Sequence, residues 1–379
     1  MRALRWIEID PHALGHNVRQ FRGLIGRRRR LLAVVKANAY GHGLVETAAI
    51  VRGAGADWLG VNSLDEAVAL REAGNGSSIL ILGAIPLDGV NEAVARGFRF
   101  VAYNRETVRK ASEATGEHSV SAFLHFKVET GTHRQGIPSR GIVAFVRDAV
   151  RRPGIVAEGL SSHFANIEDT TDRRYPEGQL ETFKASLAGL EAAGIRIPIR
   201  HIACTAATIL FPKTRFNLVR VGIGLYGLWP SKETYLSSLE QGRTHLSLMP
   251  VLSWKARVVQ VKSLPKGGFV GYGCTYRTTR PTKLAVIPVG YYDGYPRGLS
   301  NAAYVLVRGR RAPVRGRIAM NFFMADVTDI PGVRLEDEVT LIGRAGKEII
   351  TADHLASLAG TISYEILSRI NPLLPRIAR

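Results

Sequence analysis

Short apolar runs alternate with amphipathic stretches from the N-terminus to about residue 230. The apolar runs have the length and the flanking turns of buried strands. They are Leu31–Lys36, Asp57–Val61, Ser78–Leu82, Phe98–Tyr103, Ala122–Val128, Val156–His163, Arg200–Cys204 and Leu218–Val221. The helical stretches between them include Ser63–Ala73, Arg105–Thr115, Arg140–Val150 and Gln179–Ala193. Eight strands with helical crossovers predict an α/β fold closed as a TIM-type (β/α)8 barrel.

After about residue 240 the pattern changes to alternation with a period of two, which indicates a mostly-β C-terminal domain. The alternating runs are Val251–Val261, Leu284–Val289, Ala303–Val307 and Val339–Ile342. A helix is expected over Thr351–Ala359, with Thr351 as its N-cap. We predict a barrel over residues 10–238 and a β-rich domain over 239–379, with which the N-terminal strand Leu4–Ile9 (within residues 1–9) pairs.

The composition is that of an ordinary globular protein, with 379 residues, 46% of them hydrophobic, and a mean hydropathy of +0.01. No apolar run reaches the roughly 18 residues that span a bilayer, and the N-terminus has no signal-peptide core. The two cysteines, Cys204 and Cys274, provide neither a disulfide framework nor a zinc spacing. We therefore expect a cytoplasmic protein without a metal site and without a membrane partner.

The net charge of +19 raises the question of nucleic-acid binding. The basic residues are spread along the whole chain, and the one dense run, Arg27–Arg30, is more typical of a solvated turn. No helix-turn-helix, zinc-finger or RNA-recognition pattern accompanies it. We expect no nucleic-acid partner. We interpret the charge as a compositional bias, to which an attraction for an anionic cofactor and substrate can add.

Lys36 is the first candidate for chemistry, because it ends an apolar run and precedes a turn-rich segment. Apolar neighbours disfavour the charged form of an amine, so its pKa can fall toward the range where it attacks a carbonyl. A lysine that snorkels from the end of a core strand is the alternative. A barrel places its chemistry at the carboxyl ends of its strands, where polar residues follow apolar runs. Those residues are Lys36, the turn Glu129–Arg134, His163, Thr205 and Arg220.

Several separated motifs together resemble the alanine racemase family, whose members are pyridoxal 5'-phosphate (PLP) enzymes with a barrel followed by a β domain. The motifs are Ala33-Val-Val-Lys-Ala-Asn-Ala-Tyr-Gly-His-Gly43, Val219-Arg-Val-Gly-Ile223, Val270-Gly-Tyr-Gly-Cys-Thr-Tyr276 and Ile287-Pro-Val-Gly-Tyr-Tyr-Asp-Gly-Tyr-Pro-Arg297. The resemblance implies that Lys36 carries the cofactor as a Schiff base. It also implies that the remaining cofactor-binding residues are Tyr40, His163, Thr205, Arg220, Gly222, Ile223 and Tyr364.

Arg220 would face the pyridine nitrogen of the cofactor in this resemblance. Because arginine does not give up its proton at accessible pH, the pyridine nitrogen would stay unprotonated. A fully delocalised carbanion is then disfavoured, which limits side reactions such as transamination.

The resemblance also implies that Arg134 and the backbone of Met320 bind the substrate carboxylate and that Tyr291 narrows the access to the site. Lys127 corresponds to a lysine that is carbamylated in many members of the family. A carbamate would turn this cation into an anion able to fix the arginine. An unmodified lysine paired with Glu129 is the alternative.

Racemisation needs a base on each face of Cα, and the resemblance assigns these roles to Lys36 and Tyr272. In the family the tyrosine comes from the partner subunit, which implies a homodimer with composite sites. The expected reaction interconverts L- and D-alanine, and the product D-alanine would serve peptidoglycan synthesis.

The chain departs from the family pattern at Ala319 and Asn321, where many members have Cys and Asp, and at Gln135, which replaces an apolar residue. Because Asn321 lacks this carboxylate, a second interpretation stays open: a racemase for other amino acids, such as serine, on the same scaffold. A decarboxylase on the same barrel would place Glu where Arg220 stands. A cofactor-carrier protein would lack residues 240–379, so both are less favoured.

Overall fold

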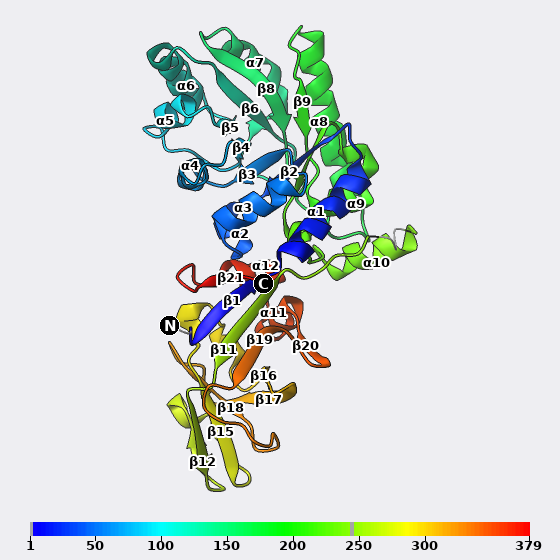
Figure 1. Ribbon diagram of the computed structural model, residues 1–379. Helices are drawn as coiled ribbons and strands as arrows, with labels where there is room; N and C mark the ends of the chain where they lie inside the picture. The colour runs from blue at the N-terminus through cyan, green and yellow to red at the C-terminus, as the bar shows by residue number, and fades with distance from the viewer. Residues whose placement is uncertain (1–2, 243–245) are drawn as a thin grey trace. The chain divides into compact units, whose positions relative to one another are not determined.

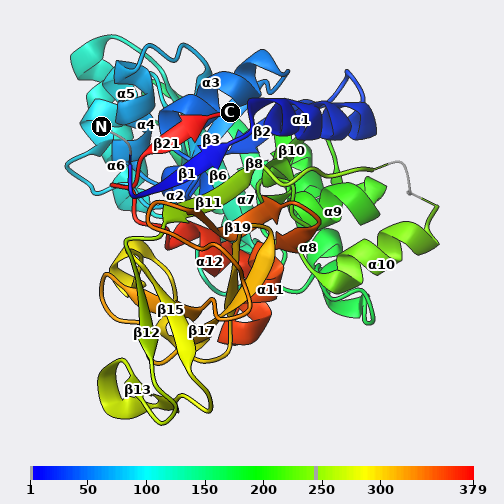
Figure 2. The same cartoon turned by 60° about the horizontal axis from the view of Figure 1, so that its bottom comes forward.

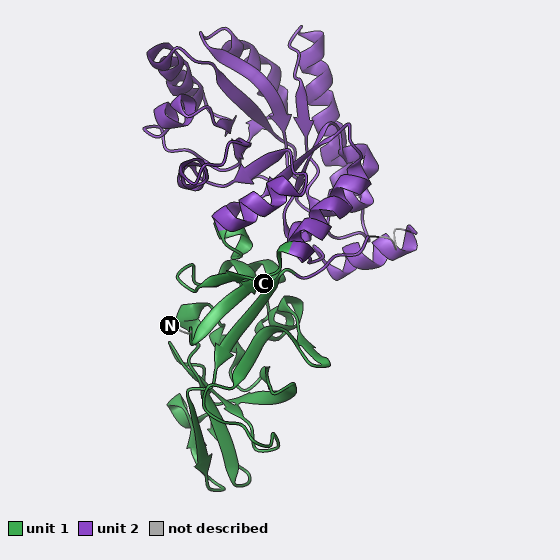
Figure 3. Ribbon diagram, in the orientation of Figure 1, with its two compact units in different colours: residues 1–11, 38–43, 251–379 green, residues 12–37, 44–250 purple. Residues whose placement is uncertain are grey.

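The computed structural model describes residues 3–242 and 246–379. The chain forms two compact units (Figures 1 and 3). One unit consists of residues 12–37 and 44–250, and the other of residues 1–11, 38–43 and 251–379. We call them the barrel unit and the β unit. No helix in the described part of the chain is long and apolar enough to cross a membrane.

The barrel unit contains a parallel sheet in the order β10-β2-β3-β4-β5-β6-β8-β9, with the short β7 beside β6. Its strands are β2 (Arg30–Val34), β3 (Trp58–Val61), β4 (Ser78–Ile81), β5 (Arg99–Ala102), β6 (Ala122–Glu129), β7 (Ile137–Pro138), β8 (Ile155–Ser161), β9 (Ile199–His201) and β10 (Leu218–Val221). The first and last strands of this order come together where the N–H of Arg220 donates to the carbonyl of Ala203 at 3.0 Å. The predicted TIM-type barrel is therefore confirmed as a nearly closed one.

Helices follow the strands in the alternation that the sequence predicts (Figure 1). They are α1 (Pro11–Ile25), α3 (Leu44–Gly53), α4 (Leu64–Glu72), α5 (Val90–Ala95), α6 (Arg105–His118), α7 (Ile142–Val150), α8 (Arg174–Ala192), α9 (Thr205–Leu210) and α10 (Lys232–Glu240). Ser63 and Asn104 cap α4 and α6 with side-chain oxygens that accept backbone N–H groups, which fixes where these helices begin.

The predicted strand Leu31–Lys36 is shorter than expected, since β2 ends at Val34 and Lys36 begins a separate turn, α2 (Lys36–Tyr40). Four residues of this turn, from Ala37 to Tyr40, have φ of 52–54°. The turn is therefore left-handed, which costs about 1–2 kcal/mol per residue without glycine. Hydrophobicity alone does not reveal such a turn, because the run Leu31–Val35 is apolar throughout.

The β unit contains a second sheet in the order β12-β15-β18-β17-β16-β19-β11-β1-β21, with β20 beside β19. Its strands are β1 (Arg5–Ile9), β11 (Leu252–Arg257), β12 (Gln260–Leu264), β15 (Thr282–Ile287), β16 (Tyr304–Val307), β17 (Arg310–Arg315), β18 (Phe323–Asp326), β19 (Glu338–Ala345), β20 (Glu348–Ile350) and β21 (Arg376–Ala378). A small hairpin of β13 (Phe269–Val270) and β14 (Tyr276–Arg277) stands apart from this sheet (Figure 2). The predicted mostly-β second part is confirmed.

The N-terminal strand pairs with this sheet as predicted, antiparallel to β11 with Ile7 opposite Trp254. The alternating run Val251–Val261 forms β structure as expected, but the chain changes partner in the middle of this run. The N–H of Val258 donates to Asp337, whereas the N–H of Val259 donates to Val286. Two strands, β11 and β12, result from the one alternating run.

The predicted helix after Thr351 is present as α11 (Ala352–Ala359), followed by α12 (Ser363–Ser368). The Thr351 hydroxyl accepts the N–H of His354 at 3.0 Å. We expect Thr351→Ala to lower the free energy of unfolding by about 1 kcal/mol, because this N–H loses its acceptor. Urea unfolding of the two variants Thr351→Ala and Thr351→Ser measures the effect. Equal losses in both would contradict the capping role, since serine keeps the hydroxyl.

Candidate active site

Five ionisable side chains of the barrel unit lie within electrostatic reach of one another at the carboxyl ends of the strands. Lys127 belongs to β6 and Arg220 to β10, whereas the other members follow strands. The full set is Lys36, Lys127, Arg134, His163 and Arg220. The structure therefore brings together Lys36, Arg134, His163 and Arg220, which the sequence placed at one barrel mouth. Lys127, which the family resemblance singled out, joins them.

Burial lowers the pKa of Lys36, and the nearby charges of Arg134 and Arg220 lower it further. Glu66 acts in the opposite direction, by attraction. An amine in this environment keeps a larger neutral fraction than an exposed lysine does, which is the form that attacks a carbonyl or removes a proton.

Lys127 lies in the same environment, where burial and the charge of Arg134 lower its pKa to about 8. Its Nζ donates to Oε1 of Gln135 at 3.3 Å, and the Gln135 amide donates to the hydroxyl of Tyr103 at 3.2 Å. The alternative pairing of Lys127 with Glu129 is wrong. The Glu129 carboxylate instead accepts the backbone N–H groups of Gly131 and Thr132 at 2.6 and 2.7 Å.

These two bonds shape the turn that carries Arg134, because a carboxylate that accepts two successive N–H groups closes a tight loop. The loop is also attached to the segment after β8, since the Thr132 hydroxyl donates to the carbonyl of His163 at 2.5 Å. Arg134 itself is exposed, so its guanidinium is free to meet a ligand.

Arg220 is buried and donates through both terminal nitrogens. Nη2 donates to the carbonyls of Ser162 and Ile202 at 2.7 and 3.0 Å and lies 3.2 Å from Nδ1 of His163. Nη1 contacts Nδ1 of His201 at 2.7 Å and its carbonyl at 3.0 Å. No described residue accepts a hydrogen bond from Nε of Arg220, so this N–H remains for a bound group. Burial lowers the pKa of Arg220 to about 10, and the side chain stays cationic at neutral pH.

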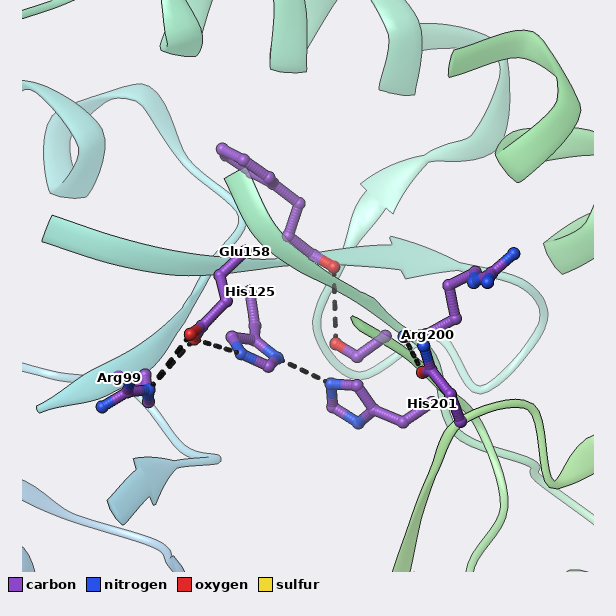
Figure 4. Close-up of polar contacts among 8 residues, drawn as sticks. Arg99, His125, Glu158, Arg200 and His201 are labelled. Atoms are coloured by element: carbon purple, nitrogen blue, oxygen red, sulfur yellow. Dashed lines mark hydrogen bonds and ion pairs between the residues drawn. The ribbon is translucent and has the colours of Figure 1, made fainter. Parts of the chain in front are cut away.

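His201, which contacts Arg220, begins a chain of buried and half-buried side chains that the sequence reasoning missed. Figure 4 shows its members His201, His125, Glu158 and Arg99. His201 Nε2 is 2.8 Å from Nδ1 of His125, whose Nε2 is 3.0 Å from Oε2 of Glu158. Arg99 donates from Nε to both Glu158 oxygens, at 3.1 and 3.2 Å. The alternation of His125, Lys127 and Glu129 along one face of β6 was the available signal.

Thr205, Gly222 and Ile223 lie where the two ends of the strand order, β9 and β10, come together. The N–H of Gly222 donates to the Thr205 hydroxyl at 3.1 Å. Thr205 begins α9, and Ile223 begins a 3₁₀ turn directly after β10. A hydroxyl beside backbone N–H groups is an arrangement that suits a phosphate.

In the β unit the structure groups the remaining candidates in two places. The rings of Tyr40 and Tyr364 lie 6.1 Å apart, centroid to centroid. The N–H of Tyr291 donates to Ala319, and the N–H of its neighbour Tyr292 donates to Met320, at 3.1 and 3.0 Å.

Tyr272 is 73% exposed and lies between two glycines, Gly271 and Gly273, that both have φ of 71°. Residues other than glycine rarely adopt this backbone conformation. The two flanking glycines therefore allow a turn that exposes the tyrosine side chain.

The charge balance of the barrel site fits an anionic cofactor. Four basic side chains meet there, and the neighbouring carboxylates of Glu66 and Glu129 accept backbone N–H groups. An aldehyde with a phosphate would supply the missing negative charge and a carbonyl carbon for the amine. These residues therefore fit pyridoxal phosphate. In the described residues, no group of three or more His, Cys, Asp or Glu side chains is placed to hold a metal ion.

The fold and the site define a barrel enzyme whose reactive group is a lysine amine among arginines. Comparison with known proteins agrees, since residues 9–230 match the family described as "Alanine racemase, N-terminal domain" and residues 251–378 match "Alanine racemase, C-terminal domain". The chain belongs to the alanine racemase family, and it is an amino-acid racemase, an isomerase.

Individual relatives cover almost the whole chain. The alanine racemase of Halothermothrix orenii is 42% identical over 372 residues, which is 98% of this chain and 96% of the relative. The crystal structure of alanine racemase from Streptomyces lavendulae superposes with a TM-score of 0.92 at 34% identity, covering 100% of this chain and 98% of that one. A histidine racemase from Leuconostoc mesenteroides subsp. sake superposes with a TM-score of 0.89 at 29% identity, covering 100% and 98%.

Proposed function

We propose that this chain binds pyridoxal 5'-phosphate and interconverts L- and D-alanine by moving a proton at Cα between two bases. The observation that carries the proposal is the half-buried Lys36 amine, whose pKa is lowered by desolvation and by Arg134 and Arg220, in a chain of the alanine racemase family. When bound, the cofactor acidifies the Cα–H bond of the amino acid attached to it.

Lys36 would hold the aldehyde carbon of the cofactor through Nζ. Thr205, Gly222, Ile223, Tyr40 and Tyr364 would hold its phosphate, through hydroxyl groups and backbone N–H groups. The neutral state of His163, whose pKa burial and Arg220 lower well below the ordinary value, suits a residue that packs beside the ring.

Arg220 would donate from Nε to the pyridine nitrogen and keep it unprotonated. This role follows from the bonds that already occupy Nη1 and Nη2 and from a guanidinium that stays charged at neutral pH. Because a proton at the pyridine nitrogen would stabilise negative charge at Cα for longer, its exclusion limits transamination.

The two bases would be Lys36 on one face of Cα and Tyr272 on the other. Each removes a proton from one enantiomer and returns one to form the other. Arg134 and the backbone N–H of Met320 would bind the substrate carboxylate, and Tyr291 would narrow the access for larger side chains. We propose that Tyr272 reaches the site of the partner subunit in a homodimer, which suits its exposure of 73%.

A racemase for a different or broader set of amino acids is the second candidate. Asn321 lacks a carboxylate found in many relatives, and a histidine racemase shares this fold. Racemisation of alanine, serine and histidine by the cofactor-loaded protein in D2O, followed by chiral chromatography and mass spectrometry, distinguishes the candidates. Deuterium at Cα of alanine in both enantiomers is the expected result. Inversion of serine or histidine without inversion of alanine would overturn the assignment of substrate.

D-alanine formed in this way would serve peptidoglycan synthesis. Growth of a D-alanine-requiring bacterial strain on expression of this chain tests this role. Growth that still requires added D-alanine would contradict it.

We further propose that Lys127 is carbamylated by CO2. The neutral amine adds to carbon dioxide, forming an N–C bond and releasing one proton. With a pKa of about 8, about half of the amine is neutral at pH 8 but only about one part in a hundred at pH 6.

Protein equilibrated with ¹³CO2 should therefore give a carbamate ¹³C signal at pH 8 that weakens toward pH 6. Lys127→Met provides the control, in which the signal should be absent. A wild-type spectrum without a carbamate signal would mean that Lys127 stays an amine bonded to Gln135.

A further inference from the structure

A chain of four buried or half-buried side chains runs from Glu158 to Arg220 through the barrel unit. Its successive contacts are 3.0 Å from Glu158 to His125, 2.8 Å from His125 to His201, and 2.7 Å from His201 to Arg220. Both histidines have no exposed surface, and Arg220 is 7% exposed. Each of the four imidazole nitrogens of His125 and His201 therefore depends on its neighbour in this chain of contacts for a partner.

Only one placement of the protons satisfies all three contacts. The Arg220 guanidinium can only donate, so Nδ1 of His201 must accept. Since burial keeps both imidazoles neutral, His201 then carries its proton on Nε2 and donates it to Nδ1 of His125. His125 in turn carries its proton on Nε2, and this N–H needs an acceptor. The Glu158 carboxylate is that acceptor.

The fold holds the far end of this chain as firmly as the near end. Arg99, the first residue of β5, donates from Nε to both Glu158 oxygens. Gly159 leaves the room that the imidazole occupies, because a Cβ at this position would lie 2.3 Å from Nδ1 of His125. The chain of contacts thus ends on a fixed carboxylate in the middle of β8, which accepts the last proton of the order.

A merely structural role does not account for this arrangement. Barrel interiors are ordinarily filled by branched apolar side chains, and well-packed apolar residues often stabilise a core as well as buried ionic groups do. A charge linked through two neutral rings to the arginine of the site does have a consequence for that arginine. The Glu158 charge keeps Nδ1 of His201 unprotonated, so that this atom accepts the hydrogen bond from Nη1 of Arg220. The guanidinium is thereby held in one orientation, which fixes the direction in which its Nε–H points.

We propose that Glu158 is a positioning residue for the racemase reaction: through His125 and His201 it fixes the proton order that holds the Arg220 guanidinium toward the cofactor. The proposal rests on the function proposed above. It predicts that a substitution at Glu158 changes kcat and the absorbance of the bound cofactor, and that this effect disappears when the contact between His125 and His201 is removed.

The test compares Glu158→Leu with Glu8→Leu in the cofactor-loaded enzyme. Glu8 is a matched control, because each carboxylate is 13% exposed and paired with an arginine. Glu158→Leu should lower kcat about tenfold and shift the absorbance of the bound cofactor, whereas Glu8→Leu should change neither. Glu158→Gln keeps an acceptor oxygen and should recover most of kcat.

The variant His201→Asn tests whether the effect of Glu158 passes through His201. Asparagine keeps an acceptor oxygen for Arg220, but its side chain is too short to contact His125. In this background Glu158→Leu should have no further effect on kcat or absorbance. A tenfold loss that persists there would overturn the proposal, as would an equal loss in Glu8→Leu.

A second measurement does not depend on activity or on the stability of a variant. Imidazole ¹⁵N spectra of the wild-type protein, with and without cofactor, should show His125 and His201 both neutral with the proton on Nε2. A proton on Nδ1 of either ring, or a doubly protonated ring, overturns the proposal. If these spectra are as expected but no amino acid racemises, the proposed function fails and the proton order stands.

Discussion

Lys36→Ala is expected to lower kcat for alanine by about 10⁴-fold and to remove the absorbance of the lysine-bound cofactor. The reason is that the variant loses both the amine that holds the cofactor and one of the two bases. Chiral chromatography measures the reaction, and the visible spectrum of the cofactor-soaked protein measures the attachment.

Two controls separate this loss from a general defect. Lys184→Ala removes an exposed lysine of α8 that pairs with Glu181, and it should behave as wild type does. Added methylamine should restore part of the activity of Lys36→Ala, since a small amine can occupy the vacated volume and accept the proton. Retention of the lysine-bound spectrum in Lys36→Ala would show that another amine carries the cofactor.

Tyr272→Phe is expected to lower kcat/KM by about 10²–10⁴-fold, because one face of Cα loses its base. The loss in kcat/KM must be equal in the two directions, since the equilibrium constant between enantiomers is one. Exchange of the Cα proton with solvent need not be equal. In D2O one enantiomer should still exchange through Lys36 without inversion, while the other exchanges slowly.

Mixed dimers test which subunit supplies the tyrosine. A dimer of one Lys36→Ala chain and one Tyr272→Phe chain, purified through two different tags, contains one intact site if the sites are composite. It should show about half of the wild-type activity, although both parent dimers are nearly inactive. A mixed dimer as inactive as its parents would mean that lysine and tyrosine of each site belong to the same chain.

The barrel could be predicted because its strands are apolar on both faces and separated by helical periodicity. Leu218–Val221 forms a strand over the predicted residues, since apolar residues flank the single arginine. The division of the alternating run Val251–Val261 into two strands could not be predicted, because a change of hydrogen-bonding partner after Val258 leaves no mark on the hydrophobic pattern. The left-handed turn after Lys36 could not be predicted either, since none of its residues from Ala37 to Tyr40 is a glycine.

The active site, like the fold, has residues that could be predicted from the sequence and residues that could not. Residues at the carboxyl ends of strands could be nominated from the barrel alone, and Lys36, Lys127, Arg134, His163 and Arg220 do come together. Glu158 could not, because its partner His125 lies on another strand and the contact depends on the absence of a side chain at Gly159. Pairings of this kind depend on the three-dimensional register of the strands and not on any local pattern.

The pairing of β2 with β10 has a consequence for the order in which the barrel folds while the ribosome makes the chain. Leu32 lies opposite Arg220 in a parallel pair. The strand before Lys36 can pair early with β3 on its other side, but it finds β10 only after most of the barrel has been made. Contacts of such long sequence separation form late in folding. A nascent chain therefore carries its reactive lysine for most of translation without the arginine of the site. Stable capture of the cofactor should then report the completed barrel, after β10 has left the ribosome.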